Sequence, residues 1–156
     1  MEVKYLKGEQ GITQNVIQHI DATTDQVFPY LSTTEGIQQW FPQLSFKDQE
    51  VGGTVVFNME DTRQEMEITH YEPNKVVGFT WDKGTVKFVL AEIQGATQIT
   101  LEEHLPHEFP HIAADFTGWQ FHMKSIQQLV EKGSPLDQQN YNFDEVTNEI
   151  KNQLDL

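Results

Sequence analysis

The sequence contains no cysteine, and this absence removes several kinds of site. Disulfide bonds, thiolate zinc sites, iron–sulfur clusters and cysteine nucleophiles all need the thiol group. Disulfides also belong mainly to oxidising compartments, so a chain without cysteine agrees with a cytoplasmic protein. No motif for a cofactor is present in the rest of the chain. We therefore expect a cytoplasmic protein without a cofactor.

Basic residues are scarce as well. Lysine and arginine together number 10 against 24 acidic residues, which gives a net charge of −14, and Arg63 is the single arginine. Because the lysines do not cluster, phosphate backbones and anionic membrane surfaces would be repelled. No apolar run approaches the roughly 18 residues of a membrane span, and no signal-peptide core follows Met1. We expect no nucleic-acid partner, no membrane partner and no secretion.

Apolar residues are nevertheless plentiful enough for a folded core. The chain has 156 residues, of which 37% are hydrophobic, and ten are phenylalanine. A disordered acidic chain would contain far less apolar material. A chain of this length forms one domain that can bury a core without disulfides or metals.

The pattern of apolar residues changes along the chain. Residues 1–12 show no sustained period and are expected to be a loosely held lead-in, and residues 13–20 resemble a strand. Residues 24–41 fit two short helices, the first limited by Pro29 and the second ended by Pro42. From Gly52 to Leu105, apolar residues alternate with polar ones in five or so segments separated by turn residues. This alternation predicts an antiparallel meander.

A long amphipathic helix is predicted after Pro110. Apolar residues recur every three or four positions as far as Lys132, and Gly133 is a suitable stop. Asp115 is assigned to the polar face of this helix. Residues 133–156 resume a weaker helical pattern. The expected organisation is a lead-in over 1–12, a domain over 13–132, and a C-terminal extension with a short helix over 133–156.

The fold class is therefore α+β. The apolar stripe of the long helix and the inward face of the meander are the two large surfaces that must be buried. A curved antiparallel sheet wrapped around the C-terminal helix buries both, with two short helices after the first strand. Such curvature leaves a space between sheet and helix that is suited to a small molecule.

Five blocks of the sequence, taken in order, resemble a known family. The blocks are TTEGIQQWFP, VGGTVVF, MEITHYEPNKVVGFTW, ATQITLEEHL and DFTGWQFHMKSIQQLV. They resemble the activator of heat-shock protein 90 ATPase homologue domain (AHSA-type), within the START-like helix-grip superfamily (SRPBCC, Bet v-like), over residues 13–132. The resemblance implies a tunnel or pocket between sheet and helix. Relatives bind lipids, hormones, polyketides or aromatic compounds, and some catalyse cyclisation, but no catalytic motif carries over.

Large apolar side chains on the inward positions are candidates for the lining of a ligand cavity. Aromatic rings and methionines suit an apolar or aromatic ligand, although the same side chains can simply form a packed core. Two histidines in phase with this set could bind the ligand or act as acid or base, and the alternative is a histidine at the edge of the core. The candidates are Trp40, Phe41, Phe57, Met59, Met66, Ile68, His70, Phe79, Trp81, Phe88, Phe116, Trp119, His122 and Met123.

Other polar groups favour the surface. His104, His107 and His111, interleaved with Glu102, Glu103 and Glu108, permit a metal site, but their spacing does not enforce convergence and a solvated rim is preferred. Glu65 and Glu67 are expected to point to solvent. Arg63 could bind a ligand carboxylate or pair with Glu60 or Asp61. No catalytic residue and no metal ligand is assigned.

Three functions follow from these observations. The first is binding of a hydrophobic small molecule, without catalysis, by a monomer or homodimer. The second is a regulator that interacts with a chaperone, because an acidic surface could complement a basic partner. The third is a cavity enzyme of cyclase or hydrolase type that uses His70 or His122, and it is the least favoured.

Overall fold

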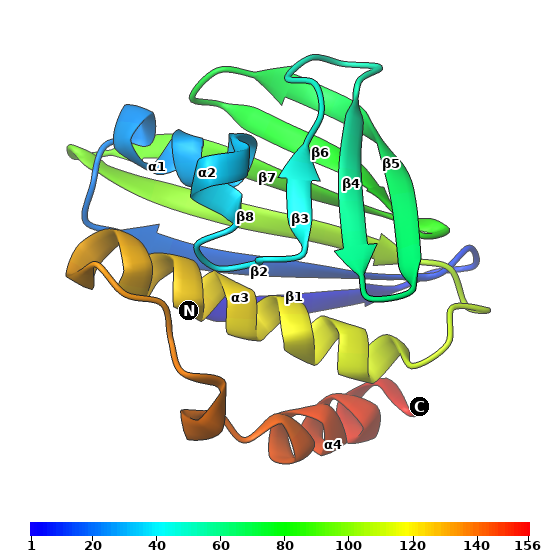
Figure 1. Cartoon of the computed structure of the whole chain (residues 1–156). Coiled ribbons are helices and arrows are strands. Elements are labelled where there is room, and N and C mark those ends of the chain that lie inside the picture. The colour runs from blue at the N-terminus through cyan, green and yellow to red at the C-terminus, as the bar shows by residue number, and fades with distance from the viewer.

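A curved antiparallel sheet holds one long helix in its concave face, as the α+β helix-grip prediction requires (Figure 1). The computed structural model describes all 156 residues. Eight strands follow the order β1-β2-β8-β7-β6-β5-β4-β3. The strands are β1 (Glu2–Lys7), β2 (Ile12–Ile20), β3 (Leu44–Phe46), β4 (Thr54–Met59), β5 (Thr62–Glu72), β6 (Val76–Trp81), β7 (Gly84–Ile93) and β8 (Ala96–Leu105). The helices are α1 (Thr24–Ser32), α2 (Thr34–Ile37), α3 (Ile112–Lys132) and α4 (Phe143–Leu154), with a short 3₁₀ turn at Gln138–Asn140.

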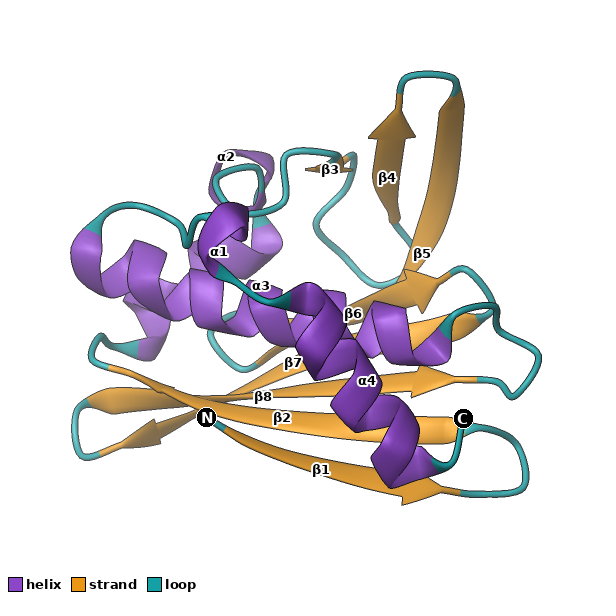
Figure 2. Ribbon diagram, turned by 90° about the horizontal axis from the view of Figure 1, so that it is seen from below, coloured by secondary structure: helices purple, strands orange, loops and turns teal.

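The sheet curls around α3. Figure 2 shows β1, β2 and β8 on one side of the helix, while the β4–β5 hairpin projects away from the other strands. The helix ends where the sequence predicts, because Gly133 adopts a left-handed conformation (φ 87°) and its N–H donates to the carbonyl of Leu129. None of the helices combines the length and the apolar character that crossing a bilayer requires.

The prediction of a loose lead-in over residues 1–12 is wrong. Residues 2–7 form β1, which pairs antiparallel with Ile12–Ile17 of β2. As an edge strand, β1 carries charged residues such as Lys4 that face solvent, and only Val3 and Tyr5 are half-buried. The apolar signal is therefore too weak to mark a strand. The three-residue strand β3 is also missed, because it is too short to show a period.

A β-bulge divides β5 into two halves. The register against β6 shifts between Ile68 and His70. An extra residue reverses the alternation of a strand, so the residues that face inward change from even to odd numbers. Met66 and Ile68 are buried before the bulge. After it, Tyr71 turns inward and its ring packs edge-on against Phe28, with centroids 5.6 Å apart.

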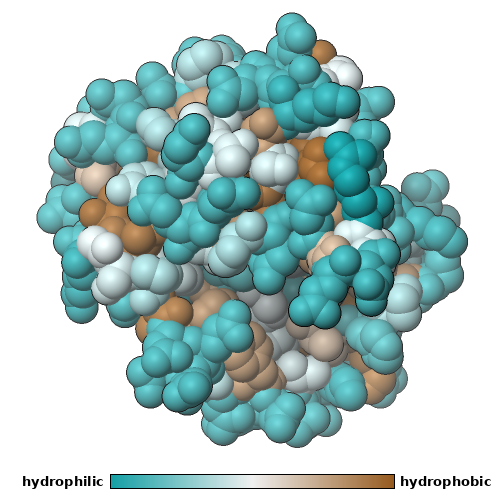
Figure 3. Space-filling view, viewed as in Figure 1, coloured by the Kyte–Doolittle hydropathy of each residue, from teal (hydrophilic) through white to brown (hydrophobic).

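Two hydrophobic cores support the fold. The larger core lies between the sheet and α1, α2 and α3 and includes Phe88 and Trp119. The smaller core forms where α4 packs against α3, and Ile150 and Leu154 of α4 belong to it together with Phe116. Hydrophilic side chains cover most of the face seen in Figure 3, with only scattered hydrophobic areas. The extension over 133–156 thus adds core residues to the body.

Candidate functional site

The interior between sheet and α3 is filled by aromatic rings. Trp119 of α3 lies at their centre, with ring centroids 5.1 Å from Trp81, 5.7 Å from Phe41, 6.0 Å from Phe88 and 6.3 Å from Trp40. These distances are those of direct aromatic contact. None of the five main pockets is lined by Trp119 or Phe88. The rings occupy the space in which the sequence predicts a cavity.

Most of the cavity candidates belong to this packed core, and two half-buried ones lie at its edge. Phe57 and Trp81 are the two at the edge, in contact with each other at 5.7 Å between centroids. Phe116 instead belongs to the smaller core and stacks on Tyr5 at 5.9 Å. The buried members of the main core are Trp40, Phe41, Met66, Ile68, Phe79, Phe88, Trp119 and Met123.

Two candidates do not face the interior. Met59 is 60% exposed, because it lies at the tip of the β4–β5 hairpin beyond the end of the core. His70 is exposed because the bulge after Ile68 turns it outward. It borders a polar pocket of about 290 Å³ on the outer face of the sheet, beside the ion pair of Lys87 and Glu102 (3.1 Å). The prediction that Met59 and His70 point inward is wrong.

His122 lies among the rings. Its imidazole stacks on Phe41 with centroids 4.5 Å apart, and its Nδ1 is buried without a hydrogen-bond partner. Burial lowers the pKa of His122 to about 3. The ring is therefore neutral at physiological pH and serves as a packing element.

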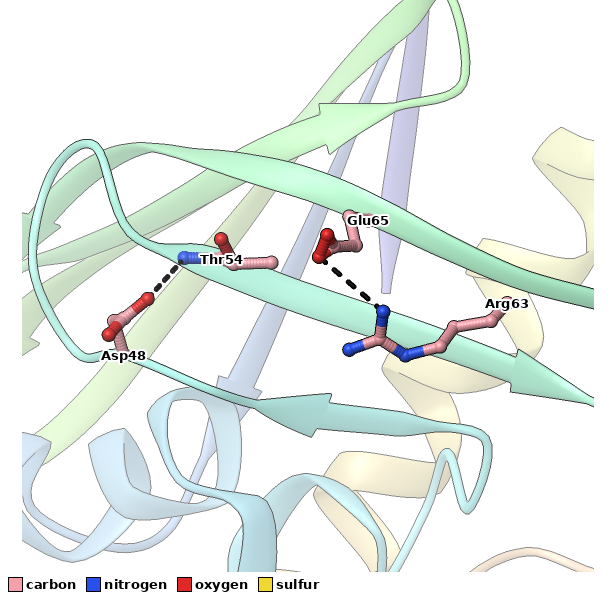
Figure 4. A network of polar contacts seen from close by, with 4 residues as sticks. All are labelled: Asp48, Thr54, Arg63 and Glu65. Carbon is pink, nitrogen blue, oxygen red and sulfur yellow. Dashed lines mark hydrogen bonds and ion pairs between the residues drawn. The ribbon is translucent and has the colours of Figure 1, made fainter.

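The remaining histidines and Arg63 lie at the surface. Nδ1 of His104 is 2.9 Å from the Thr13 hydroxyl, and Nε2 of His107 is 2.6 Å from the Gly8 carbonyl oxygen. No group of three or more His, Asp or Glu side chains converges in a way that could hold a metal ion. Arg63 pairs with Glu65 at 3.5 Å, as Figure 4 shows, and both are exposed.

Figure 4 also shows the hydrogen bond at the start of β4. The carboxylate of Asp48 accepts a hydrogen bond from the backbone N–H of Thr54 at 3.1 Å, which fixes the loop before β4 (Figure 4). Glu65 and Glu67 point to solvent, as predicted. The polar groups on this part of the sheet thus stabilise local structure.

A chain of buried polar side chains crosses the smaller core. Nε2 of Gln14 donates to Oε1 of Glu103 at 2.9 Å and to the Phe116 carbonyl at 3.2 Å. Nε2 of Gln120 in turn donates to Oε1 of Gln14 at 3.0 Å and to the Tyr5 hydroxyl at 2.7 Å. Glu103 and Gln14 are fully buried. Buried polar groups of this kind are retained only when they satisfy one another.

This series of buried polar side chains ends in two carboxyl groups, those of Glu103 and Asp115. Oε2 of Glu103 and Oδ2 of Asp115 are buried, and neither atom has a hydrogen-bond partner in the protein. Burial first, and then the neighbouring Asp115 carboxyl, raise the pKa of Glu103 well above its usual value, and the hydrogen bond from Gln14 opposes this only in part. Both effects favour the protonated, uncharged form of Glu103. Oδ1 of Asp115 accepts a hydrogen bond from the indole N–H of Trp81 at 3.2 Å.

This carboxyl pair was not among the sequence candidates. Glu103 was grouped with Glu102 in a solvated rim, yet it is in phase with Ile99, Leu101 and Leu105, all fully buried. That alternation was the available signal. Asp115 carries no such signal, because only the tertiary structure places the first turn of α3 beside Trp81.

A small pocket opens beside the carboxyl pair. It has a volume of about 320 Å³ and lies between the β4–β5 hairpin, the β6–β7 turn and the start of α3. We call it the mouth pocket. Three aromatic rings and two carboxylates meet in it, and no basic side chain lines it. Its residues are Phe57, Gln64, Trp81, Asp82, Phe109 and Asp115.

Comparisons with known proteins agree with the architecture. The family model described as Activator of Hsp90 ATPase homolog 1-like protein matches residues 21–131. A conserved protein of unknown function from Enterococcus faecalis has a similar structure, with a TM-score of 0.92, 27% sequence identity, and coverage of 99% of this chain and 91% of that one.

Two further structures share the fold. The Aha1 dimer from Colwellia psychrerythraea has a TM-score of 0.66 at 21% identity and covers 78% of this chain and 97% of its own. CalU16 from Micromonospora echinospora has a TM-score of 0.69 at 18% identity and covers 95% and 90%. No curated protein matches the sequence.

Proposed function

This chain belongs to the family of Activator of Hsp90 ATPase homolog 1-like proteins, and from that premise we propose that it binds a small molecule in the mouth pocket. The observation that carries the proposal is that three aromatic rings and the carboxylates of Asp82 and Asp115 line one hollow. Ligand sites combine mostly apolar walls with a few placed polar groups. The packed rings behind Trp81 make the mouth, rather than the interior, the place for the ligand.

The size of the pocket restricts the ligand. A volume of about 320 Å³ is at the low end of the range for small-molecule sites. A longer ligand would have to displace the ring of Trp81, which contacts Trp119 at 5.1 Å and is bonded to Asp115. We therefore propose a small ligand, or one group of a larger molecule, seated against Phe57, Trp81 and Phe109.

The placement of the acid and base side chains supports ligand binding without catalysis. An enzyme of cyclase or hydrolase type would need an acid or base at the ligand. His70 lies on the outer face, and His122 is neutral among the rings. The Glu103–Asp115 pair is the remaining acid–base group beside the pocket, so the binding experiment should also examine the ligand for chemical change.

Native mass spectrometry of the purified protein tests the proposal directly. We expect a copurifying small molecule, or a hit from a compound library that raises the melting temperature of the wild type. Phe109→Ala should abolish the effect, because the half-buried Phe109 ring lines the pocket. Phe143→Ala is the matched control, since Phe143 is half-buried beside Tyr141 and outside the pocket. Equal loss in both variants would contradict the site, and a changed mass of the bound compound would indicate catalysis.

A second function is favoured by the family itself and by the net charge of −14. We propose as the alternative a cytoplasmic regulator, monomer or homodimer, that contacts a basic surface of a chaperone. The protein would then change the ATPase rate of heat-shock protein 90 in a salt-dependent way. An unchanged rate across a full titration, with no complex in analytical ultracentrifugation, would dismiss this alternative.

A further inference from the structure

The charges around the mouth pocket all have one sign. Asp82 in the β6–β7 turn and Asp115 in the first turn of α3 line it, and no lysine, arginine or histidine does. An anionic ligand would face two carboxylates without a basic partner. The whole chain carries a net charge of −14, which attracts cations to the surface.

The aromatic rings that line the mouth pocket also favour a cation. Phe57, Trp81 and Phe109 line the same pocket as the two carboxylates. The face of an aromatic ring carries partial negative charge and attracts a cation, tryptophan most strongly. A neutral apolar group would gain contact with the rings but would leave the two carboxylates without a cationic partner.

The buried carboxyl oxygens behind the pocket wall also favour a positively charged ligand. Oδ2 of Asp115 and Oε2 of Glu103 have no hydrogen-bond partner in the protein. Glu103 is fully buried, so water does not reach it. A positive charge in the mouth pocket would interact favourably with the Asp115 carboxylate, which forms no ion pair with a basic residue of the protein.

We propose that the mouth pocket binds an organic cation, an alkylammonium or quaternary ammonium group, seated on the Trp81 and Phe109 rings and facing Asp82 and Asp115. This rests on the proposed function and names the chemical class of its ligand. Rings and carboxylates together favour only this class. The class includes free amines and the ammonium end of larger molecules.

Titration with choline tests the proposal. The neutral carbon analogue 3,3-dimethylbutan-1-ol has the same shape, and sodium chloride keeps the ionic strength constant. The readout is the NMR signal of the Trp81 indole N–H, which is assigned by its absence in Trp81→Phe. We expect a saturable shift with choline and binding of the alcohol at least about tenfold weaker.

Charge-neutral variants identify the residues. Asp82→Asn should weaken choline binding about fivefold, as expected for the loss of one partly exposed ionic contact. Asp21→Asn is the control, because Asp21 lies exposed at the other end of α3, where its backbone N–H donates to Glu131. It should leave the affinity unchanged. Circular dichroism confirms that each variant is folded.

The outcomes separate this inference from the proposed function. If the alcohol binds as tightly as choline, the pocket takes small molecules but the cation assignment is overturned. If Asp82→Asn and Asp21→Asn weaken choline binding equally, the effect is one of net charge and the assignment is also overturned. If neither probe moves the Trp81 signal at saturating concentration, the cation inference fails, while the library screen with Phe109→Ala still decides the proposed function.

Discussion

Glu103 and His122 should give opposite pH dependences to the free energy of unfolding. Burial and Asp115 raise the pKa of Glu103 well above 4.5, so between pH 5 and pH 6 folding takes up a proton there. Burial lowers the pKa of His122 from 6.5 to about 3, so over the same range folding releases a proton. A raised pKa gives stability that is lost as pH rises, and a lowered pKa gives stability that is lost as pH falls. In the wild type the two effects oppose each other.

The magnitude follows from the ordinary pKa values of the unfolded chain. With 4.5 for glutamate and 6.5 for histidine, His122 contributes about 1.2 kcal/mol between pH 5 and pH 6, and Glu103 contributes at most about the same amount with opposite sign. Glu103→Gln removes the contribution that falls as pH rises, so from pH 5 to pH 6 the unfolding free energy of the variant should rise by up to about 1.2 kcal/mol more than that of the wild type. His122→Phe removes the rising contribution and should show the reverse. The double variant should run parallel to the wild type.

Urea denaturation followed by tryptophan fluorescence measures these differences, since all three tryptophans belong to or contact the main core. Carboxyl groups far from Glu103 and His122 affect every variant alike and cancel in the comparison. Glutamine can still accept from Gln14, and phenylalanine keeps the stacking on Phe41. A difference between Glu103→Gln and the wild type that stays constant from pH 5 to pH 6 would refute the proton assignment.

Stability measurements on four other variants test the packing. Trp119→Ala should lower the unfolding free energy by about 3–5 kcal/mol, because it empties the centre of the ring cluster. Met59→Ala should change it by less than about 0.5 kcal/mol, because the side chain is 60% exposed; a larger loss would place the hairpin tip in the core. Gly36→Ala should cost about 1–3 kcal/mol, since a Cβ there would lie 2.0 Å from the Pro29 carbonyl oxygen. Ile150→Ala should cost about 2–5 kcal/mol in chemical denaturation, and a negligible change would show that α4 does not contribute to the core.

The main elements could be predicted because their residues follow simple periods. The stripe from Ile112 to Val130 defines α3, and the alternation around Phe79 and Phe88 defines central strands. The sequence does not predict β1, because an edge strand with charged residues shows little alternation of apolar and polar residues. The sequence does not predict the bulge before His70, because an inserted residue can be recognised only when the register against the partner strand is known.

The site was predicted less well than the fold. Inward positions such as Trp119 were found by phase, but phase does not distinguish rings that line a cavity from rings that fill it. The carboxyl pair was missed for another reason. Glu103 is charged by type, and a charged residue is assigned to solvent unless its buried partner is known. The hydrogen-bond partner of Glu103 is Gln14 of β2, and its neighbour Asp115 belongs to α3.

The cross-strand bond between Gln14 and Glu103 also has a consequence for how the chain assembles. These residues lie 89 positions apart in the sequence and face each other directly between β2 and β8. A slip of the pairing by one residue would bring Thr13 or Asn15 opposite Glu103 and would turn one of the polar partners to the wrong face. Only the native alignment gives the buried carboxyl its amide donor. The polar pair therefore adds a second constraint on the strand register, beside the alternation of buried residues in β2 and β8.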